Sequence, residues 1–440
     1  MNSQREIKDC VLTLAFGFVV CTVWAGYYQT AKAADTTLRS GASLRSTSWP
    51  NWRGPNHNGI SSETGWSIAW PKEGPIVLWK ASIGTGFSSM AVSNGRVYAM
   101  GNINDNDILY CLDADKGEEI WKQSYPCPLF PESHEGGPAA TPTVDGDAVY
   151  TFSKNGDAIR FRAATGQVVW HRNLIKELRI EHPTWYFASS PLIVDNLVIL
   201  NAGTRGIALN KTDGSLAWKN GNGACGYATA VPFTVAGQKL ASSGAFGGAR
   251  CVALFVSREI VGLSAATGKL LWTSQWRTSY DINAADPIIS GDKMFISSGY
   301  NKGCALFKIG LSNLTEIWRN KNMNNHASSC VLWKEHIYGF DGQFGGSGQL
   351  TCLDHETGQA KWSQRGMGTG SLCLADDKLI ILSERGKLVI AEASPKGFKE
   401  LASAQILTGK CWTVPVLANG RIYARNADGQ LICVDVRSKG

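Results

Sequence analysis

The sequence predicts an all-β protein, an eight-bladed β-propeller made of four-stranded antiparallel blades. Its 440 residues include 48 Gly and 16 Trp, which is typical of many short strands joined by tight turns. One short segment recurs along the chain and contains a Gly followed, four residues later, by a Trp. The tryptophans of successive copies lie 42 to 54 residues apart, which is the length of one propeller blade. Apolar runs between the copies are separated by Asn-Gly, Asp-Gly or Ser-Gly pairs, which favour β-hairpin turns.

The recurring segment is clear in five copies, and weaker copies end at Trp79 and Trp318. Its Gly permits the positive φ of a turn between the last two strands of a blade. Its Trp offers a large flat ring that packs against the next blade. We therefore predict a structural docking role, without catalysis, for the Gly and Trp of the five clear copies: Gly117 and Trp121, Gly166 and Trp170, Gly214 and Trp218, Gly268 and Trp272, and Gly358 and Trp362.

The stretches between tryptophans predict the inner strands of each blade. Residues 190–194 and 197–200 form one such pair of apolar runs, with a short turn between them. Many of these runs are apolar on both faces, which fits sheets packed between two neighbours. Further pairs are 141–144 with 148–152, 287–289 with 293–297, and 415–417 with 421–424.

Counting the blades requires the two chain ends. Six blades close at Trp121, Trp170, Trp218, Trp272, Trp318 and Trp362, and a seventh, 370–401, keeps its strands without the Gly and Trp. The last blade, 411–436, has only three predicted strands. We expect residues 76–79 to supply its outer strand, because pairing the two ends leaves no free sheet edge at the junction.

The N-terminus is typical of an exported protein. Arg5 and Lys8 precede an apolar run at 11–26, and Ala31 and Ala33 place small residues where a signal peptidase reads them. The run is shorter than the roughly 20 residues that span a bilayer, which favours a cleaved signal; an uncleaved anchor is the alternative. We predict a signal peptide at 1–33, an N-terminal extension at 34–74 and a single propeller at 75–440. The expected location is the periplasm or cell envelope. Membrane contact is expected only peripherally or through an uncleaved N-terminal anchor.

Charge and cysteine content exclude several classes of protein. With 18% charged residues and 44% hydrophobic residues, the chain does not resemble a disordered protein or a coiled coil. Its net charge of +7 is scattered, so nucleic acid is not an expected partner. No Cys or His spacing predicts a metal site. Cys111, Cys352 and Cys433 recur at one position of the repeat and are expected to fill the core, whereas disulfide pairing of the other cysteines stays open.

Long connections are expected to meet at one mouth of the central channel, because each enters an innermost strand. They span 122–138, 171–187, 273–284, 319–327 and 410–413, and they carry polar and aromatic side chains of the kind that form ligand sites. The alternative for any one of them is to cap strand ends with hydrogen bonds. The candidate ligand-binding residues are Glu135, Tyr186, Asn283, His326 and Trp412.

The repeated Gly and Trp resemble the tryptophan-docking motif of pyrroloquinoline-quinone-type propellers, from Trp49 to the C-terminus. Residues 51–59, Asn-Trp-Arg-Gly-Pro-Asn-His-Asn-Gly, also resemble the opening of exported members of that group. The resemblance implies the fold. The group contains quinoprotein alcohol dehydrogenases and also BamB-type propellers, which bind other proteins during outer-membrane assembly. Both use the motif structurally, so it does not choose between them.

A quinoprotein dehydrogenase requires oxygen ligands for Ca²⁺ and an aromatic surface for the flat quinone. Glu135, Asn283 and Asp286 are possible oxygen ligands and Trp412 a possible stacking surface, but their spacing does not impose this arrangement. No adjacent Cys pair or covering insertion is present. We therefore expect a non-catalytic binding or scaffold protein of the envelope, BamB-like, with a protein or glycan partner and no cofactor or metal. The alternative is an alcohol or sugar dehydrogenase that uses pyrroloquinoline quinone with calcium, and its catalytic residues are unknown.

Overall fold

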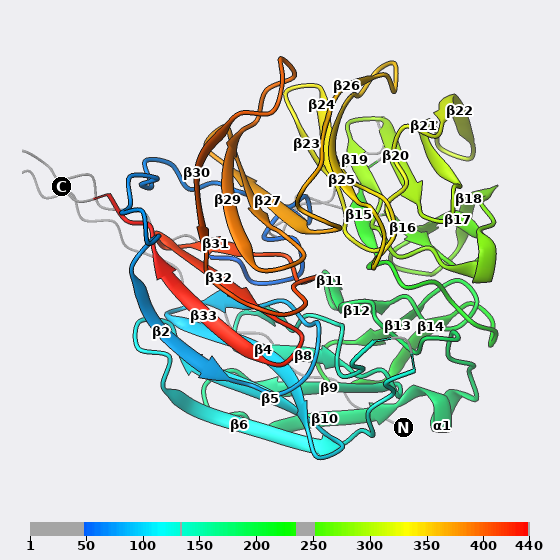
Figure 1. Cartoon of the computed structure of the whole chain (residues 1–440). Coiled ribbons are helices and arrows are strands. Elements are labelled where there is room, and N and C mark those ends of the chain that lie inside the picture. Colours follow the sequence, from blue (N-terminus) through cyan, green and yellow to red (C-terminus); the bar gives the residue numbers. More distant parts are fainter. Residues whose placement is uncertain (1–47, 133, 235–250, 439–440) are drawn as a thin grey trace, which may run out of the picture. The chain divides into compact units, whose positions relative to one another are not determined.

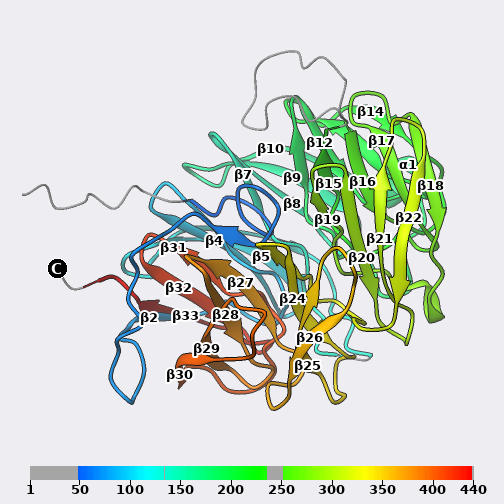
Figure 2. The same cartoon turned by 90° about the horizontal axis from the view of Figure 1, so that it is seen from above.

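A computed structural model describes residues 48–132, 134–234 and 251–438. The predicted signal peptide and the first part of the predicted extension lie outside these residues. The described chain contains 33 strands, one short helix, α1 (Leu174–Leu178), and one 3-10 turn, η1 (Ser279–Asp281). No helix within the described ranges is long and apolar enough to cross a membrane. The strands form eight antiparallel blades, which confirms the predicted fold class (Figures 1 and 2).

Blades 1 to 4 follow one another along the chain, and each consists of four consecutive strands. Blades 1 and 2 contain β3 (Ala91–Ser93), β4 (Arg96–Ile103), β5 (Asn106–Asp113) and β6 (Glu119–Pro126), then β7 (Thr143–Asp145), β8 (Ala148–Phe152), β9 (Asp157–Arg162) and β10 (Val168–Asn173). Blades 3 and 4 contain β11 (Leu192–Val194), β12 (Leu197–Leu200), β13 (Ile207–Asn210) and β14 (Leu216–Lys219), then β15 (Val231–Phe233), β16 (Cys251–Phe255), β17 (Glu259–Ser264) and β18 (Leu270–Gln275).

Blades 5 to 8 continue the pattern, except that blade 8 has only three consecutive strands. Blades 5 and 6 contain β19 (Ile288–Ser290), β20 (Lys293–Ser298), β21 (Gly303–Ile309) and β22 (Leu314–Asn320), then β23 (Val331–Trp333), β24 (His336–Asp341), β25 (Gln349–Asp354) and β26 (Ala360–Gln364). Blades 7 and 8 contain β27 (Ser371–Ala375), β28 (Lys378–Leu382), β29 (Lys387–Glu392) and β30 (Glu400–Gln405), then β31 (Val416–Ala418), β32 (Arg421–Arg425) and β33 (Gln430–Asp435).

The two ends of the described chain close the ring. Strand β2 (Val77–Ser82) pairs antiparallel with β33, and Trp79 lies opposite Cys433. Both views show the blue β2 beside the red β33 (Figures 1 and 2). This confirms the predicted closure, although the strand extends beyond the expected residues 76–79. The sequence did not predict β1 (Ile60–Ser61), which adds a parallel fifth strand to β27.

Each repeat Gly packs against the Trp of the preceding blade. A Cβ added to Gly166 would lie 2.6 Å from a ring carbon of Trp121, and the φ of Gly166 is 74°. The Trp121 Nε1 donates a hydrogen bond to the Ala163 carbonyl, 3.0 Å away, in the same turn. Gly at this position therefore serves both the turn and the close approach of the ring. The same contacts recur for Gly117 on Trp79, Gly214 on Trp170, Gly268 on Trp218 and Gly358 on Trp318.

Trp272 departs from this pattern. Its indole lies over its own blade, where a Cβ added to Gly262 would lie 2.2 Å from the ring. Its Nε1 is buried and has no hydrogen-bond partner. Blade 5, which follows, lacks the repeat Gly; its corresponding turn is closed by a bond from Gly310 N to the Asn313 carbonyl at 2.9 Å. Without the docking turn, the indole has no carbonyl to receive its N–H.

The ten described cysteines are buried and unpaired. Cys111, Cys352 and Cys433 lie among core residues of their blades. Burial raises the pKa of Cys352 and Cys433 to about 12. These thiols are therefore core side chains of low reactivity.

Candidate functional site

A series of hydrogen bonds between neighbouring blades follows the central channel from blade 1 to blade 6. Ser89 N donates to Thr141 Oγ1 at 3.1 Å, Thr141 N to Ser190 Oγ at 2.9 Å, and Ser190 N to Thr229 Oγ1 at 3.0 Å. Each of these residues stands just before the innermost strand of its blade. We call the six linked residues the channel belt: Ser89, Thr141, Ser190, Thr229, Asp286 and Ser329.

Asp286 is the one carboxylate in the channel belt. Its Oδ1 accepts a bond from Thr229 N at 2.7 Å, as a hydroxyl does elsewhere in the belt. Its Oδ2 accepts a bond from Trp52 Nε1 at 2.5 Å and lies 3.8 Å from Arg53 Nε. Burial raises the pKa of Asp286, and the Arg53 charge and these hydrogen bonds oppose that rise. Arg53 and Asp286 therefore form a buried ion pair at the channel.

Trp52 and Arg53 belong to residues 49–61, which we call the channel segment. It begins beside blades 1 and 2. Trp49 exchanges two backbone hydrogen bonds with Val92 in β3, both 2.8 Å long, and the Pro50 carbonyl accepts from Val144 N in β7 at 2.7 Å. Its start is thus held by the innermost strands of two adjacent blades.

The channel segment ends against blades 6 and 7. Arg53 Nη2 donates to the Cys330 carbonyl at 2.7 Å, and Leu374 N in β27 donates to the Gly59 carbonyl at 2.9 Å. Since the segment contacts innermost strands on several sides of the ring, it crosses the channel. Its partners in β3, β7 and β27 lie past the entry to those strands, so it closes the end of the channel remote from the long connections.

A cavity of about 580 Å³ occupies the open end of the channel. Trp52 of the channel segment and Asp286 of the belt line it, so they form its floor. The remaining wall residues come mainly from the connections that precede the innermost strands. Its aromatic lining consists of Trp52, Phe87, Phe130, Trp185, Tyr186, Phe187, Tyr227, Tyr300, Phe344 and Trp412. Its titratable lining outside these residues consists of His134, Lys154, Asp286, His326, Glu384, Arg385 and Lys410.

Trp412 is the centre of an aromatic stack on this wall. Phe344 stacks on it with ring centroids 3.8 Å apart and an interplanar angle of 6°, and Phe87 stacks at 5.4 Å. The Trp412 Nε1 donates to Glu384 Oε1 at 3.1 Å, and Lys410 Nζ lies 4.5 Å from its ring centroid. The indole is therefore already engaged through its ring and its N–H.

His326 and Tyr300 extend this aromatic wall. His326 meets Phe344 edge to face with centroids 5.0 Å apart, and its Nε2 lies 3.0 Å from the Tyr300 hydroxyl. Burial lowers the pKa of His326. The imidazole is thus held neutral near pH 7 and takes part in the wall as a packed ring with a polar edge.

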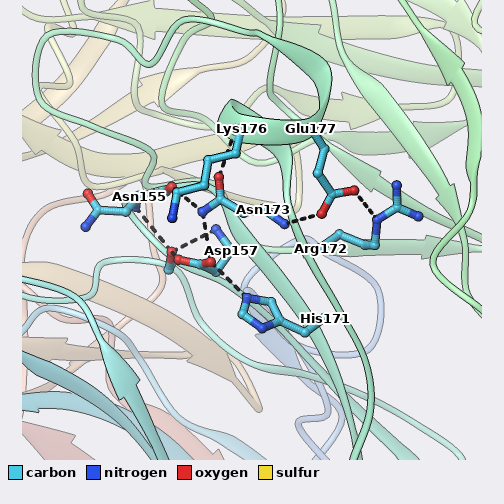
Figure 3. Close-up of polar contacts among 8 residues, drawn as sticks. Asn155, Asp157, His171, Arg172, Asn173, Lys176 and Glu177 are labelled. Atoms are coloured by element: carbon cyan, nitrogen blue, oxygen red, sulfur yellow. Dashed lines mark hydrogen bonds and ion pairs between the residues drawn. The ribbon is translucent and has the colours of Figure 1, made fainter.

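A polar network holds the connection that carries Tyr186 (Figure 3). His171 Nε2 and Asn173 Nδ2 both contact Asp157 Oδ1, at 2.8 and 2.9 Å, and Asn173 Oδ1 accepts from Lys176 N at 3.0 Å. Asn173 is thereby the N-cap of α1. These bonds fix the start of the connection.

The end of the same connection brings two aromatic rings to the cavity. Trp185 N donates to the Tyr227 hydroxyl at 3.2 Å. Tyr186 stacks on His182 at 4.4 Å and meets Phe130 edge to face at 4.6 Å. Tyr186 is therefore positioned by its neighbours on the cavity wall rather than left as a mobile surface ring.

The family model described as outer membrane protein assembly factor BamB matches residues 62–173, 105–364 and 348–440. The chain belongs to this BamB family. No curated protein matches the chain. Among solved structures, BamB from Moraxella catarrhalis is 14% identical with a TM-score of 0.57, and the match covers 82% of this chain and 99% of that one.

Other structures share the fold of this BamB family member. A quinohemoprotein alcohol dehydrogenase from Comamonas testosteroni is 13% identical with a TM-score of 0.61, covering 89% of this chain and 81% of that one. The computationally designed Ika8 protein is 11% identical with a TM-score of 0.54, covering 84% and 100%. At these identities the likeness shows the fold alone.

The five sequence-predicted ligand residues have different positions in this propeller. Tyr186, His326 and Trp412 all line the cavity. The Glu135 carboxylate does not line it and pairs with Lys410 Nζ at 2.8 Å. Asn283 is 0% exposed.

The Asn283 amide is saturated by the protein. Its nitrogen donates to the carbonyls of Val256, Ser257 and Trp276, and its oxygen accepts from Ser298 Oγ at 2.7 Å. Asn283 therefore caps strand ends, which is the alternative role that the sequence left open for each candidate.

Sequence reasoning missed Trp52, Phe87 and Phe344 as cavity residues. Trp52 lies in residues 51–59, whose sequence indicates only the resemblance to the family. Phe344 lies in a Gly-rich connection at 342–348, and such a loop can bring a ring close to other backbone. Phe87 stands two residues before the belt residue Ser89, a position that only the belt pattern itself identifies.

The three residues proposed from the sequence as possible calcium ligands do not form a calcium site. Asp286 accepts bonds from Trp52 and Thr229, Asn283 faces backbone carbonyls, and Glu135 binds Lys410. Across the part of the chain that the structure describes, no three His, Cys, Asp or Glu residues are grouped to hold a metal ion. Trp412 is covered by Phe344. This arrangement does not fit pyrroloquinoline quinone with calcium.

Proposed function

We propose that the protein is an exported binding protein of the cell envelope that receives a segment of a partner protein in its aromatic cavity. Membership of the BamB family and the export signal expected at 1–33 support an envelope role. The observation that carries the proposal is the channel segment, because it converts an open channel into a cavity with a floor of Trp52 on Asp286.

The chemistry of the cavity favours binding over catalysis. About 580 Å³ lies within the range of roughly 300–1,000 Å³ typical of ligand pockets. Its carboxylates are engaged by protein donors, Asp286 by Trp52 and Glu384 by Trp412. Neither is placed as a free general base, so stacking and edge hydrogen bonds are what the walls offer to a bound peptide.

Photo-cross-linking in the native envelope tests this proposal. A p-benzoylphenylalanine probe placed at Tyr186 samples the cavity. The same probe at Leu270 samples the outermost strand of blade 4, β18, where Leu270 is 40% exposed and does not line the cavity. We expect a discrete protein adduct from Tyr186 and none from Leu270. Equal labelling at both positions, or no adduct at either, would contradict the proposal.

The dehydrogenase alternative has its own assay. Purified protein is incubated with pyrroloquinoline quinone and excess Ca²⁺, and dye-linked oxidation of alcohols and sugars is measured. We expect no turnover, because the available oxygens are bound elsewhere. Calcium-dependent turnover that Asp286→Asn or Glu135→Gln abolishes would make the enzyme interpretation correct.

A further inference from the structure

Lys154 is a buried cation on the cavity wall. It follows β8 in the turn to β9, it is one of the residues that line the cavity, and it is only 5% exposed. Its Nζ has no hydrogen-bond partner. A buried ammonium without an acceptor is costly, so such a group in a cavity points to an acceptor supplied by a ligand.

The protein's own anions do not satisfy Lys154. Asp107 lies near enough to raise its pKa, but burial, which lowers that pKa, is the larger effect. Within the described ranges no carboxylate oxygen lies within 4.0 Å of the Lys154 Nζ. Asp107 Oδ1 accepts from Asn102 Nδ2 at 2.7 Å, and Asp107 Oδ2 is buried without a hydrogen-bond partner, so it does not reach the ammonium. Burial is the main cause that lowers the pKa of His134 on the cavity wall, and the charges of Lys410 and Lys154 lower it further.

The cavity wall carries an excess of positive charge. Lys410 is balanced by Glu135, and Asp286 is balanced by Arg53. Lys154 and Arg385 form no ion pair with any residue that the structure describes, and neither does the Glu384 carboxylate on the same wall, so one net positive charge remains. These cations stand among aromatic rings, so the walls suit a ligand that joins a negative group to an apolar body.

We propose that the cavity binds a carboxylate carried on an apolar or aromatic body, received by Lys154, and that its source is the C-terminus of the partner segment. This inference rests on the proposed function. A carboxylate suits Lys154 better than a phosphate dianion does, because the Asp107 carboxylate already acts on the same ammonium and would repel a second negative charge. A free aromatic acid would present the same chemistry.

Calorimetric titration of the full chain tests the inference with defined probes. The hexapeptide acetyl-GSGSGF is compared as the free acid and as the C-terminal amide. We expect the acid to bind the wild-type protein at least about tenfold more tightly, since the amide removes the charge that pairs with Lys154. This comparison needs no variant. Equal binding of the two forms, or no binding of either, would overturn the inference.

A substitution then assigns the effect to Lys154. Lys154→Met should abolish the preference for the acid without lowering Tm, because it removes a buried charge that lacks an acceptor. Lys396→Met, at an exposed lysine that does not line the cavity, should leave the preference unchanged. If Lys154→Met retains the acid preference, Lys154 is not the receptor and the inference fails.

Two further probes identify the source of the carboxylate. Tighter binding of the peptide acid than of N-acetylphenylalanine supports a C-terminus, whereas equal binding supports a free aromatic acid with the same receptor. Displacement of the peptide by an equal concentration of inorganic phosphate would overturn the choice of carboxylate. An adduct from Tyr186 without any acid preference would leave the proposed function standing and remove only this inference.

Discussion

Trp52 and Asp286 stand 234 positions apart in the chain, and a hydrogen bond from the Trp52 Nε1 to the Asp286 Oδ2 joins them at the floor of the cavity. The remaining Asp286 oxygen continues the channel belt through Thr229. One carboxylate therefore serves both the ring of blades and the segment that crosses it. The closed end of the channel depends on this residue.

Asp286→Asn should destabilise the protein. It leaves Arg53 buried without its anion, and breaking one partner of a buried ion pair typically costs about 3–5 kcal/mol. Equilibrium denaturation measures the free energy of unfolding. Asp292→Asn is the matched control, since the Asp292 side chain is 50% exposed and its loss should change stability by less than about 1 kcal/mol. Similar effects of the two substitutions would contradict the buried pairing.

Two repeat tryptophans should respond differently to removal of their indole N–H. Trp170 Nε1 donates to the Lys211 carbonyl at 3.0 Å, whereas Trp272 Nε1 has no partner. Trp170→Phe should therefore cost about 1 kcal/mol more than Trp272→Phe in chemical denaturation. Full truncation to Ala should cost about 3–5 kcal/mol at either position, because both rings are buried. Equal costs for the two Phe variants would contradict the assigned contacts.

Removal of residues 48–80 should cause aggregation. The deletion takes away most of β2, which pairs with β33, and leaves an open sheet edge in blade 8. It also removes the channel segment. Size-exclusion chromatography with light scattering measures the state of association. A monomeric truncated protein with an unchanged Tm would show that the two ends do not close the ring.

Stability should fall as the pH drops from about 6.5 to about 4. Burial, together with the Arg53 charge, lowers the pKa of His57 to about 4, against about 6.5 in the unfolded chain. The unfolded state therefore binds more protons in this window, and the His57 contribution, complete above pH 6.5, is lost by about pH 4. His57→Gln should flatten the pH dependence of the unfolding free energy, whereas His336→Gln, at a partly exposed residue, should not. An unchanged slope in His57→Gln would contradict this assignment.

The fold was predictable because its determinants repeat along the chain. The Gly and Trp at positions such as Gly166 and Trp170 mark blade boundaries locally, and the missing strand of the last blade could be found by counting. Contacts that occur once leave no such pattern. Nothing near residue 286 distinguishes an aspartate that holds Trp52 from one that faces solvent.

The same limit applies to the cavity. Tyr186, His326 and Trp412 were found because connections to innermost strands meet at one mouth. Asn283 lies in a similar connection, yet its amide turns toward backbone carbonyls, and polarity alone does not reveal that choice. Phe344 depends on the path of a Gly-rich loop, which is set by tertiary packing rather than by a local preference.

The most direct test of a partner-binding cavity combines the probe at Tyr186 with Trp412→Ala. Trp412 carries the stacking interactions with Phe344 and Phe87, so its loss should disrupt the wall that receives the partner segment. The yield of the Tyr186 adduct in the native envelope is measured in both backgrounds, at equal protein level and with Tm determined in parallel. We expect the adduct to fall at least about tenfold, which corresponds to about 1.4 kcal/mol of binding, while Tm changes little. An undiminished adduct in Trp412→Ala would contradict the account.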